Sequence, residues 1–354
     1  MRINFILNSV NDAHSLKRVS DFRKKGLEVN VYGFLRNDET CVDSNTMVLG
    51  VFSNTLSYRK RVKIYYRGIK KLFSQHKDNG DLWFYLGLDV AIFAVLADHH
   101  RKFIYEECDL VHTYTCNKKA QSVMEGIDKF IIKKAHRTII TSEGFLDFHY
   151  GKKAFPDNII IVPNKLSNDI TRFGTTCKAV HDPSHLRFAF VGGVRYQSLL
   201  SIADKIGKNF PYHEFHFYGF ISPTLLEKEL PQRENIIYHG RYKSPEQLPE
   251  IYSNIDVLIC TYDTQNENVR YAEPNKLYEA IYFSCPIIVS SNTFLAKQVD
   301  RLGIGYNVNA FDEDEIKNLV KRIEREIIDK YTSMKQLDKS IAIDNNSYIN
   351  NIIH

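Results

Sequence analysis

The segment from Tyr271 to Ser290 combines residue types that can bind a phosphorylated ligand. It reads Tyr-Ala-Glu-Pro-Asn-Lys-Leu-Tyr-Glu-Ala-Ile-Tyr-Phe-Ser-Cys-Pro-Ile-Ile-Val-Ser. Pro274 is typical of the first turn of a helix, and Asn275 and Glu279, four residues apart, then share a helix face. A carboxylate one turn into such a helix can accept hydrogen bonds from two ribose hydroxyls, while Lys276 adds positive charge for a diphosphate. The alternative is an ordinary helix start with acidic side chains in solvent.

A strand end, a double-glycine turn and a helix start follow one another in residues 190–196, Phe-Val-Gly-Gly-Val-Arg-Tyr. Glycines let the backbone approach a ligand closely, and a helix N-terminus offers unpaired N–H groups to a phosphate. We expect this approach at Gly193 and a charge-assisted contact from Arg195. The alternative is a tight turn with a surface arginine. The chain contains neither G-x-G-x-x-G nor a Walker P-loop, which argues against dehydrogenases and P-loop kinases.

These segments need a scaffold of alternating strands and helices. Such alternation occurs twice in the 354 residues, a length suited to two domains, and it predicts parallel sheets with helices on both faces. The strands predicted in the first round are 2–7, 27–34, 81–86, 102–105 and 137–141, with helices at 13–25, 88–99 and 119–135. Those of the second round are 186–191, 214–218, 235–238, 256–260, 286–290 and 305–308, with a last helix over 312–331.

The expected fold class is α/β, with two doubly wound domains that face each other across a cleft. Ligands of open α/β sheets bind beyond the carboxyl ends of the strands, so two substrates can meet there, which suits group transfer. The expected boundaries are an N-terminal domain over 1–168, a polar linker over 169–184 and a C-terminal domain over 185–330. The tail, 331–354, is polar but carries isoleucines, so we expect it to pack on the rest of the protein.

The motif Glu-Pro-Asn-Lys-Leu-Tyr-Glu-Ala at 273–280, before an apolar strand that begins with proline, resembles the donor-site signature of glycosyltransferase family 4 and its GT-B relatives. The Gly-Gly-x-Arg turn resembles the pyrophosphate loop of the same family. Less specific similarities are Ile-Thr-Ser-Glu-Gly-Phe at 140–145 and Ile-Val-Pro-Asn at 161–164, which resemble domain-closing segments, and Tyr-Glu-Glu-Cys-Asp-Leu at 105–110, which resembles the acceptor-side strand end. The resemblance therefore covers nearly the whole chain in order.

The resemblance implies a GT-B fold of two Rossmann-like domains, with the C-terminal segment crossing back to the first domain. It also implies a nucleotide-diphospho-sugar donor and transfer with retention of anomeric configuration. Glu279 would hold the ribose, Asn275 and Lys276 would lie near the donor phosphates, and Arg195 would contact the pyrophosphate. Arg241, in a Gly-Arg-Tyr sequence, would lie near the base.

The sequence departs from the family pattern at two positions. Tyr271 stands where the E-x7-E pattern has its first glutamate, and Glu273 either takes over the sugar contact or caps the helix. Cys108 stands where many relatives place a histidine near the reacting sugar, and its neighbours Glu106 and Asp109 are candidate polar partners of the acceptor.

A loop histidine, His14, is either a further catalytic candidate or a bystander. We expect neither a metal nor a cofactor, because Asp312-Glu-Asp314 has D-x-D spacing but is better explained as the capped start of the last helix. Arg195, Lys276 and two helix N-termini would then stabilise the leaving diphosphate electrostatically.

Composition limits the class of partner. The six cysteines are scattered without C-x-x-C pairs, which is typical of free thiols in a reducing cytoplasm.

Residues 1–172 carry 27 Lys and Arg against 19 Asp and Glu, whereas the remainder carries 20 against 23. No helix-turn-helix, RNP or zinc-finger pattern occurs, so we expect no nucleic-acid partner. No apolar run reaches the roughly 20 residues that span a bilayer.

The basic excess concentrates in residues 51–77, which contain eight Lys and Arg and no acidic residue. Apolar residues recur there at three- and four-residue steps, while Lys60, Lys63, Arg67 and Lys70 fall largely on the other side. Such a basic amphipathic helix suits an anionic lipid surface. The alternative is an apolar stripe packed on the first domain with solvated charges, and the two can coexist.

The sequence thus favours a glycosyltransferase that moves a sugar to a glycan or lipid-linked acceptor in bacterial surface polysaccharide or capsule synthesis. We expect it in the cytoplasm, peripherally bound at the inner face of the cell membrane. Two alternatives stay open. One is a GT-B sugar-nucleotide 2-epimerase; the other, suggested by Tyr271 and Cys108, is an inactive glycosyltransferase-like binding subunit.

Overall fold

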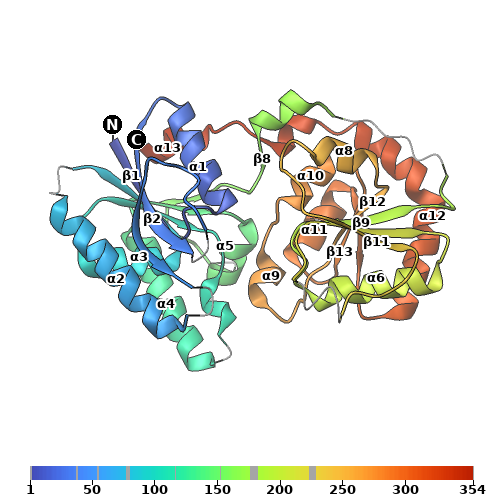
Figure 1. The fold of residues 1–354 in the computed structure, drawn as a ribbon, viewed down its shortest axis with the longest axis horizontal. Coiled ribbons are helices and arrows are strands. Elements are labelled where there is room, and N and C mark those ends of the chain that lie inside the picture. The colour runs from blue at the N-terminus through green and yellow to red at the C-terminus, as the bar shows by residue number, and fades with distance from the viewer. Residues whose placement is uncertain are drawn as a thin grey trace. The chain divides into compact units, whose positions relative to one another are not determined.

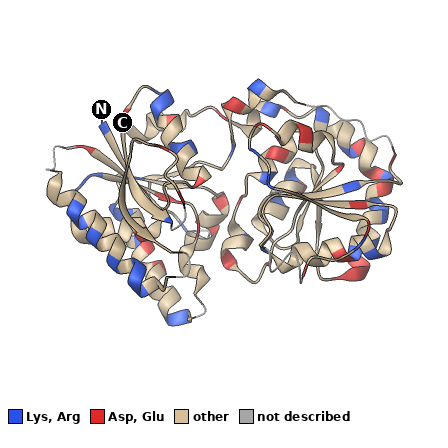
Figure 2. Cartoon of the chain, in the orientation of Figure 1, with Lys and Arg blue, Asp and Glu red and all other residues tan. Residues whose placement is uncertain are grey.

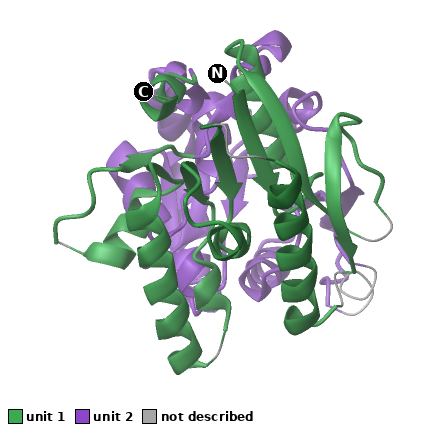
Figure 3. Cartoon of the chain, turned by 90° about the vertical axis from the view of Figure 1, so that its left-hand side faces the viewer, with its two compact units in different colours: residues 1–163, 346–354 green, residues 164–345 purple. Residues whose placement is uncertain are grey.

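The computed structural model describes residues 2–36, 39–53, 56–76, 80–115, 117–151, 153–175, 182–222 and 229–353. The chain divides into two compact units (Figure 3). Unit 1 comprises residues 1–163 and 346–354, and unit 2 comprises residues 164–345. Each unit has its own parallel sheet and its own hydrophobic core, so the α/β class predicted from the sequence is confirmed.

Unit 1 is built on a seven-stranded sheet in the order β3-β2-β1-β4-β5-β6-β7 (Figure 1). Its strands are β1 Arg2–Leu7, β2 Glu28–Arg36, β3 Thr46–Phe52, β4 Leu82–Leu86, β5 Phe103–Glu107, β6 Arg137–Ile140 and β7 Ile159–Ile161. Its helices are α1 Ala13–Lys24, α2 Tyr58–Gln75, α3 Leu88–Ala97, η1 Val111–Tyr114, α4 Lys118–Lys134, α5 Glu143–Tyr150 and α13 Tyr348–Ile353. The central strands β4 and β5 are buried along their whole length, as expected for parallel strands covered on both faces.

Unit 2 is built on a six-stranded parallel sheet in the order β11-β10-β9-β12-β13-β14. The strands of this sheet are β9 Arg187–Val191, β10 Glu214–Tyr218, β11 Ile236–Gly240, β12 Val257–Cys260, β13 Ile287–Ser290 and β14 Gly305–Val308. Two short strands, β8 Leu166–Ser167 and β15 Ile343–Asp344, pair with each other in a separate sheet. The helices of unit 2 are η2 Asn168–Phe173, α6 Gln197–Asn209, α8 Leu248–Ser253, α9 Glu267–Tyr271, α10 Lys276–Tyr282, α11 Phe294–Leu302, α12 Glu313–Lys335 and η3 Lys339–Ala342. The strand order reverses between β9 and β12, the point at which doubly wound sheets bind ligands.

Local sequence explains most of these boundaries. Asp12 caps α1 by accepting a hydrogen bond from the Ser15 N–H, and Gly26 follows the helix with φ +76°. Asp312 caps α12 in the same way, so the capping interpretation of the D-x-D spacing is confirmed. The sequence prediction misses several elements, among them β3 and α5. β3 is an edge strand with several exposed residues and lacks regular alternation, and α5 has only 8 residues.

The predicted domain boundaries need correction. Part of the expected linker belongs to unit 2, because β8 pairs with β15 and Ile170 of η2 is buried in the core of unit 2. Residues 176–181 of that linker lie outside the described residues. The last helix extends to Lys335, since Tyr331 and Met334 are still buried against unit 2. Of the tail, only residues 346–354 belong to unit 1, whose core includes the α13 side chains of Tyr348, Ile349 and Ile352.

Candidate functional site

The loop after β9 is shaped by a close approach of two backbones. Gly192 donates its N–H to the carbonyl of Tyr218 at 2.7 Å. A Cβ at Gly219, where φ is +132°, would lie only 1.9 Å from the Gly192 carbonyl oxygen, so the position requires glycine. Gly193 and the exposed Arg195 follow in the same loop. The double-glycine turn therefore lies at the carboxyl end of the central strand, as predicted.

The start of α6 differs from the expectation of a free anion site. The carboxylate of Asp263 accepts hydrogen bonds from the N–H groups of Gln197 at 3.1 Å and Ser198 at 2.8 Å. This side chain satisfies backbone donors that a phosphate would otherwise take. Positive charge for a diphosphate must therefore come from side chains and not from the helix end. Arg195 is one such side chain, and it lies in the loop before α6.

The predicted donor motif forms a buried polar cluster at the start of α10. Lys276 Nζ lies 2.7 Å from both carboxylate oxygens of Glu279, and Tyr252 of α8 donates to Glu279 Oε2 at 2.6 Å. Asn275 donates from its side-chain amide to Glu279 Oε1 at 3.2 Å, which confirms that these two residues share a face. Pro274 precedes the helix, contrary to the prediction, because Asn275 is the N-terminal flanking residue.

The cluster is held together as a buried ion pair. Lys276 and Glu279 are 6% and 2% exposed. Burial alone would lower the pKa of Lys276, but the adjacent Glu279 carboxylate outweighs it and raises that pKa. A Cβ at Gly192 would lie 3.9 Å from Lys276 Cε, so the lysine side chain lies beside the double-glycine turn. Glu279, Lys276 and the turn thus form one site within unit 2.

A pocket of about 420 Å³ is lined by residues of β10, β11 and α8, and Tyr242 in its lining forms a hydrogen bond with Lys276 of this cluster. Arg241 and Tyr242 belong to its lining, as do the parallel rings of Tyr218 and His239, whose centroids are 4.1 Å apart. Arg241 is exposed, and its guanidinium lies 4.5 Å from the ring centroid of Phe220. The structure therefore places Arg241 at a cavity that could accept a planar ring.

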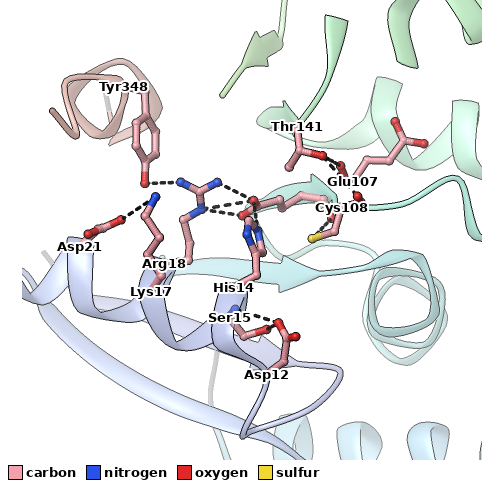
Figure 4. A network of polar contacts seen from close by, with 11 residues as sticks. Asp12, His14, Ser15, Lys17, Arg18, Asp21, Glu107, Cys108, Thr141 and Tyr348 are labelled. Atoms are coloured by element: carbon pink, nitrogen blue, oxygen red, sulfur yellow. Dashed lines mark hydrogen bonds and ion pairs between the residues drawn. The ribbon is translucent and has the colours of Figure 1, made fainter. Parts of the chain in front are cut away.

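At the carboxyl end of β5, unit 1 contains a second buried carboxylate, that of Glu106, whose neighbours Arg18, His14 and Tyr348 are labelled in Figure 4. Arg18 of α1 binds both oxygens of Glu106, the shortest contact being 2.7 Å, and it also donates to the Tyr348 hydroxyl at 2.5 Å. His14 Nε2 lies 2.7 Å from Glu106 Oε1. Burial would raise the pKa of Glu106, but Arg18 and His14 together lower it to about 2. Glu106 is therefore an anion that holds the His14 ring.

The predicted catalytic residues differ in their burial and in their partners. Glu106 is fully buried, whereas Asp109 is exposed. Partial burial and the neighbouring Glu106 and Asp109 raise the pKa of Cys108 well above its usual range, so this thiol is not activated as a nucleophile. Glu273 lies in unit 2, is buried and accepts a hydrogen bond from the Tyr278 hydroxyl.

His14 lies in the first turn of α1 and not in a loop as predicted; its ring is held by Glu106, and about a quarter of its side chain stays exposed. The supporting residues Arg18, Tyr252 and Tyr348 were not identified from the sequence. Arg18 and Tyr348 are 88 and 330 residues from their partners, and no local spacing indicates such contacts.

The basic helix predicted from the sequence is α2. Tyr65, Ile69, Leu72 and Phe73 are buried in the core of unit 1, and the predicted basic residues are exposed along the other face (Figure 2): Lys60, Lys63, Arg67 and Lys70. Among the described residues, none of these four forms an ion pair. The apolar stripe thus packs inside the protein, and only the charged face is available to a partner. None of the described helices has the length and hydrophobicity needed to cross a membrane.

Comparisons with known proteins extend these observations. Residues 187–339, which contain both the double-glycine turn and α10, match the family model described as glycosyl transferases group 1. Among curated proteins, none matches the chain by sequence.

Several solved structures share the fold of the whole chain. Sucrose-phosphate synthase from Thermosynechococcus elongatus has a TM-score of 0.70 and 15% identity, with 95% of this chain and 92% of that chain covered. HepE of Anabaena in complex with UDP-glucose has a TM-score of 0.70 and 11% identity, with 100% and 98% covered. WaaG, a glycosyltransferase involved in lipopolysaccharide biosynthesis, has a TM-score of 0.65 and 13% identity, with 96% and 97% covered. At these identities the similarity establishes the fold, and the GT-B prediction is confirmed.

Proposed function

Because the chain has the GT-B fold and its residues 187–339 match glycosyl transferases group 1, we propose that it is a glycosyltransferase that transfers a sugar from a nucleotide-diphospho-sugar bound at the Glu279–Lys276 cluster of unit 2. The observation that carries this proposal is the position of the cluster. A buried carboxylate and ammonium lie beside a glycine turn at the carboxyl end of β9. Relatives of the same fold bind UDP and UDP-glucose.

The geometry suggests how the donor replaces internal contacts. Lys276 is a flexible point charge, so it can leave Glu279 and bind the diphosphate together with Arg195. Glu279 then accepts hydrogen bonds from the ribose hydroxyls while Tyr252 keeps its carboxylate in place. Asn275 lies beside the same carboxylate, and the base would enter the pocket at Arg241. Cationic side chains would stabilise the leaving diphosphate without a metal ion.

On the side of unit 1, we propose that His14 contacts the reacting sugar or the acceptor. Its ring is oriented by Glu106, whose own carboxylate is fully buried and bound by Arg18. Glu106 would thus act as a positioning residue rather than by direct contact. Asp109, which is exposed, and Glu273, which precedes α10, stay candidates for polar contacts with the acceptor and the sugar. Retention of configuration is the proposed stereochemical outcome.

We further propose that the acceptor is lipid-linked, in bacterial surface polysaccharide synthesis, and that the exposed face of α2 binds the inner leaflet of the cell membrane. A polybasic surface gains roughly 1 kcal/mol per Lys or Arg near an anionic membrane. The attraction falls off over a Debye length of about 8 Å at physiological salt, so binding should weaken as salt rises.

Vesicle co-sedimentation tests this surface. The wild type should bind vesicles with anionic lipid at low salt, and a Lys60, Lys63, Arg67 and Lys70 to Gln variant should lose binding. A control variant removes the same number of charges from α12, at Lys317, Lys321, Arg322 and Arg325, and should bind like the wild type. Equal loss in both variants, or no binding by the wild type, would point to a soluble acceptor.

The competing functions predict different products. A 2-epimerase, a class found among proteins of similar fold, would invert C2 of the sugar without an acceptor, so its product would still be a nucleotide sugar. An inactive binding subunit leaves the donor unchanged. We expect release of nucleotide diphosphate that increases when lipid-linked or glycan acceptors are added, measured across a panel of nucleotide sugars. Epimerised nucleotide sugar with no diphosphate release would instead identify the epimerase.

A further inference from the structure

Four polar side chains meet inside unit 1, on the opposite side of β5 from Glu106. Successive residues of a strand point to opposite faces, and Figure 4 shows Glu107 directed away from Arg18 and His14. The other three side chains come from η1, α4 and α5, namely His112, Asp128 and His149. None of the four residues is more than 6% exposed.

The distances within this cluster are close to those of a metal site. Ligand atoms of Glu107, Asp128 and His149 all lie within 4.8 Å of one another. His149 Nε2 lies 2.8 Å from Glu107 Oε1, and His112 Nδ1 lies 3.5 Å from Asp128 Oδ2. In a tetrahedral site with bonds of about 2.0 Å, neighbouring ligand atoms are about 3.3 Å apart. Small side-chain shifts would therefore bring these atoms around one ion.

The cluster also contains buried polar atoms without hydrogen-bond partners. They are Glu107 Oε2, Asp128 Oδ2, His149 Nδ1 and both ring nitrogens of His112. Among the described residues, no lysine or arginine pairs with either carboxylate, and Lys129 of α4 pairs with Glu125 instead, at 2.6 Å. Buried charges in proteins are normally paired or coordinate metals. Glu106, one residue earlier, pairs with Arg18, whereas Glu107 and Asp128 pair with no arginine or lysine in the part of the chain that the structure describes.

The electrostatics of the cluster agree with a missing positive charge. Burial, and then the adjacent Asp128, raise the pKa of Glu107 well above its ordinary value. Burial lowers the pKa of His149 to about 4, which leaves the imidazole neutral, the form that binds metals.

We propose that Glu107, Asp128 and His149 bind a divalent transition-metal cation, with His112 as the fourth ligand. A set of imidazole and carboxylate ligands without thiolate fits Zn²⁺ best. Tyr105 donates its hydroxyl to Asp128 Oδ1 at 2.9 Å and would orient that ligand. The cation would join β5, η1, α4 and α5, and so fix the strand end that carries Glu106. This site is separate from the donor cluster of unit 2.

Metal content and unfolding of the wild type test the proposal directly. The full chain without a histidine tag, purified from zinc-supplemented culture, should contain about one zinc per chain after gel filtration. Zinc added to metal-free protein should raise the Tm by at least about 5 °C, because a ligand bound only by the folded state stabilises it. The Co²⁺-loaded protein should show visible absorption typical of a four-coordinate site. Absence of zinc together with an unchanged Tm would overturn the proposal in favour of carboxyl groups that share protons.

Variants locate the ion. Asp128→Asn and His149→Gln should lose the zinc and the Tm response. A second group of possible ligands, His14, Glu106 and Cys108, provides the control, so His14→Gln and Cys108→Ser should keep one zinc per chain. If an Asp128→Asn or His149→Gln chain does not fold, the Co²⁺ spectrum and stoichiometry of the wild type decide alone. Zinc retained in both ligand variants would contradict the assignment.

Discussion

Each unit buries one glutamate against one cationic side chain near the carboxyl end of its sheet, but the two pairs differ in origin. In unit 2, Glu279 pairs with Lys276, three residues earlier in the same helix. In unit 1, Glu106 pairs with Arg18, a residue 88 positions away, which also binds Tyr348 near the end of the chain. The first pair is local and the second joins distant segments.

The chemistry of the two cations explains what each pair can do. A lysine ammonium is a point charge that can move to another anion, whereas an arginine fork binds a carboxylate through several fixed donors. Glu279 can therefore exchange its partner for a ligand. Glu106 keeps its partner and instead orients His14, the more exposed member of its network. The comparison predicts that Glu279 binds the donor and that Glu106 positions His14.

The largest expected effect is on the stability of unit 1. Arg18→Met leaves Glu106 buried without its cation and should lower the free energy of unfolding by about 3–5 kcal/mol. Trp83, the only tryptophan, is buried in the core of unit 1, so its fluorescence during urea unfolding reports on this unit.

Arg23→Met is the matched control for this substitution. Arg23 forms a surface pair with Asp43 at 2.8 Å, and its loss should cost less than about 1 kcal/mol. Equal effects of the two variants would show that the Arg18 network contributes no more than a surface pair.

A smaller effect is expected at His14. Because the ring is proposed to donate or accept one hydrogen bond to a substrate, His14→Gln should reduce kcat/KM by about tenfold. The Kd of the donor nucleotide should stay unchanged, since that site lies in unit 2. His99→Gln, at an exposed histidine of unit 1, is the control and should leave kcat/KM unaltered. A weaker affinity of His14→Gln for the nucleotide alone would contradict a contact of His14 with the reacting sugar or the acceptor.

The smallest effect is expected from chelation. If Arg195 and Lys276 stabilise the leaving diphosphate, transfer measured directly after addition of excess EDTA should stay within about twofold of the untreated rate. Immediate loss that Mg²⁺ or Mn²⁺ restores would contradict a metal-independent donor site. A slow loss that follows the Trp83 unfolding signal would instead belong to the buried cluster around Glu107.

What the sequence could predict depended on how far apart the interacting residues are. The alternation of apolar segments identified both sheets to within a few residues for most strands. The contact between Asn275 and Glu279 followed from their four-residue spacing and is confirmed. The edge strand β3 was missed because an exposed edge relaxes the hydrophobic pattern.

Tertiary contacts decided the rest. Asp263 occupies the start of α6 from a loop 65 residues away, so the free helix end expected from the sequence does not occur. His14 of α1 contacts Glu106 of β5, a residue 92 positions later, so its partner could not be predicted from local spacing. The tail belongs to unit 1 only from residue 346 onward. The four residues of the proposed zinc cluster come from four separate elements and show no ligand spacing in the sequence.

Calorimetric titration with nucleotide diphosphates tests the central claim that unit 2 binds the donor through Glu279. The wild type should bind at least one of them, and Glu279→Gln should raise the Kd of the tightest by about 30- to 150-fold, because it loses about 2–3 kcal/mol of hydrogen bonding to a charged acceptor. Glu234→Gln, at an exposed glutamate of the same unit, should bind like the wild type. A wild type that binds no nucleotide diphosphate, or a Glu279→Gln chain with unchanged Kd, would contradict the account.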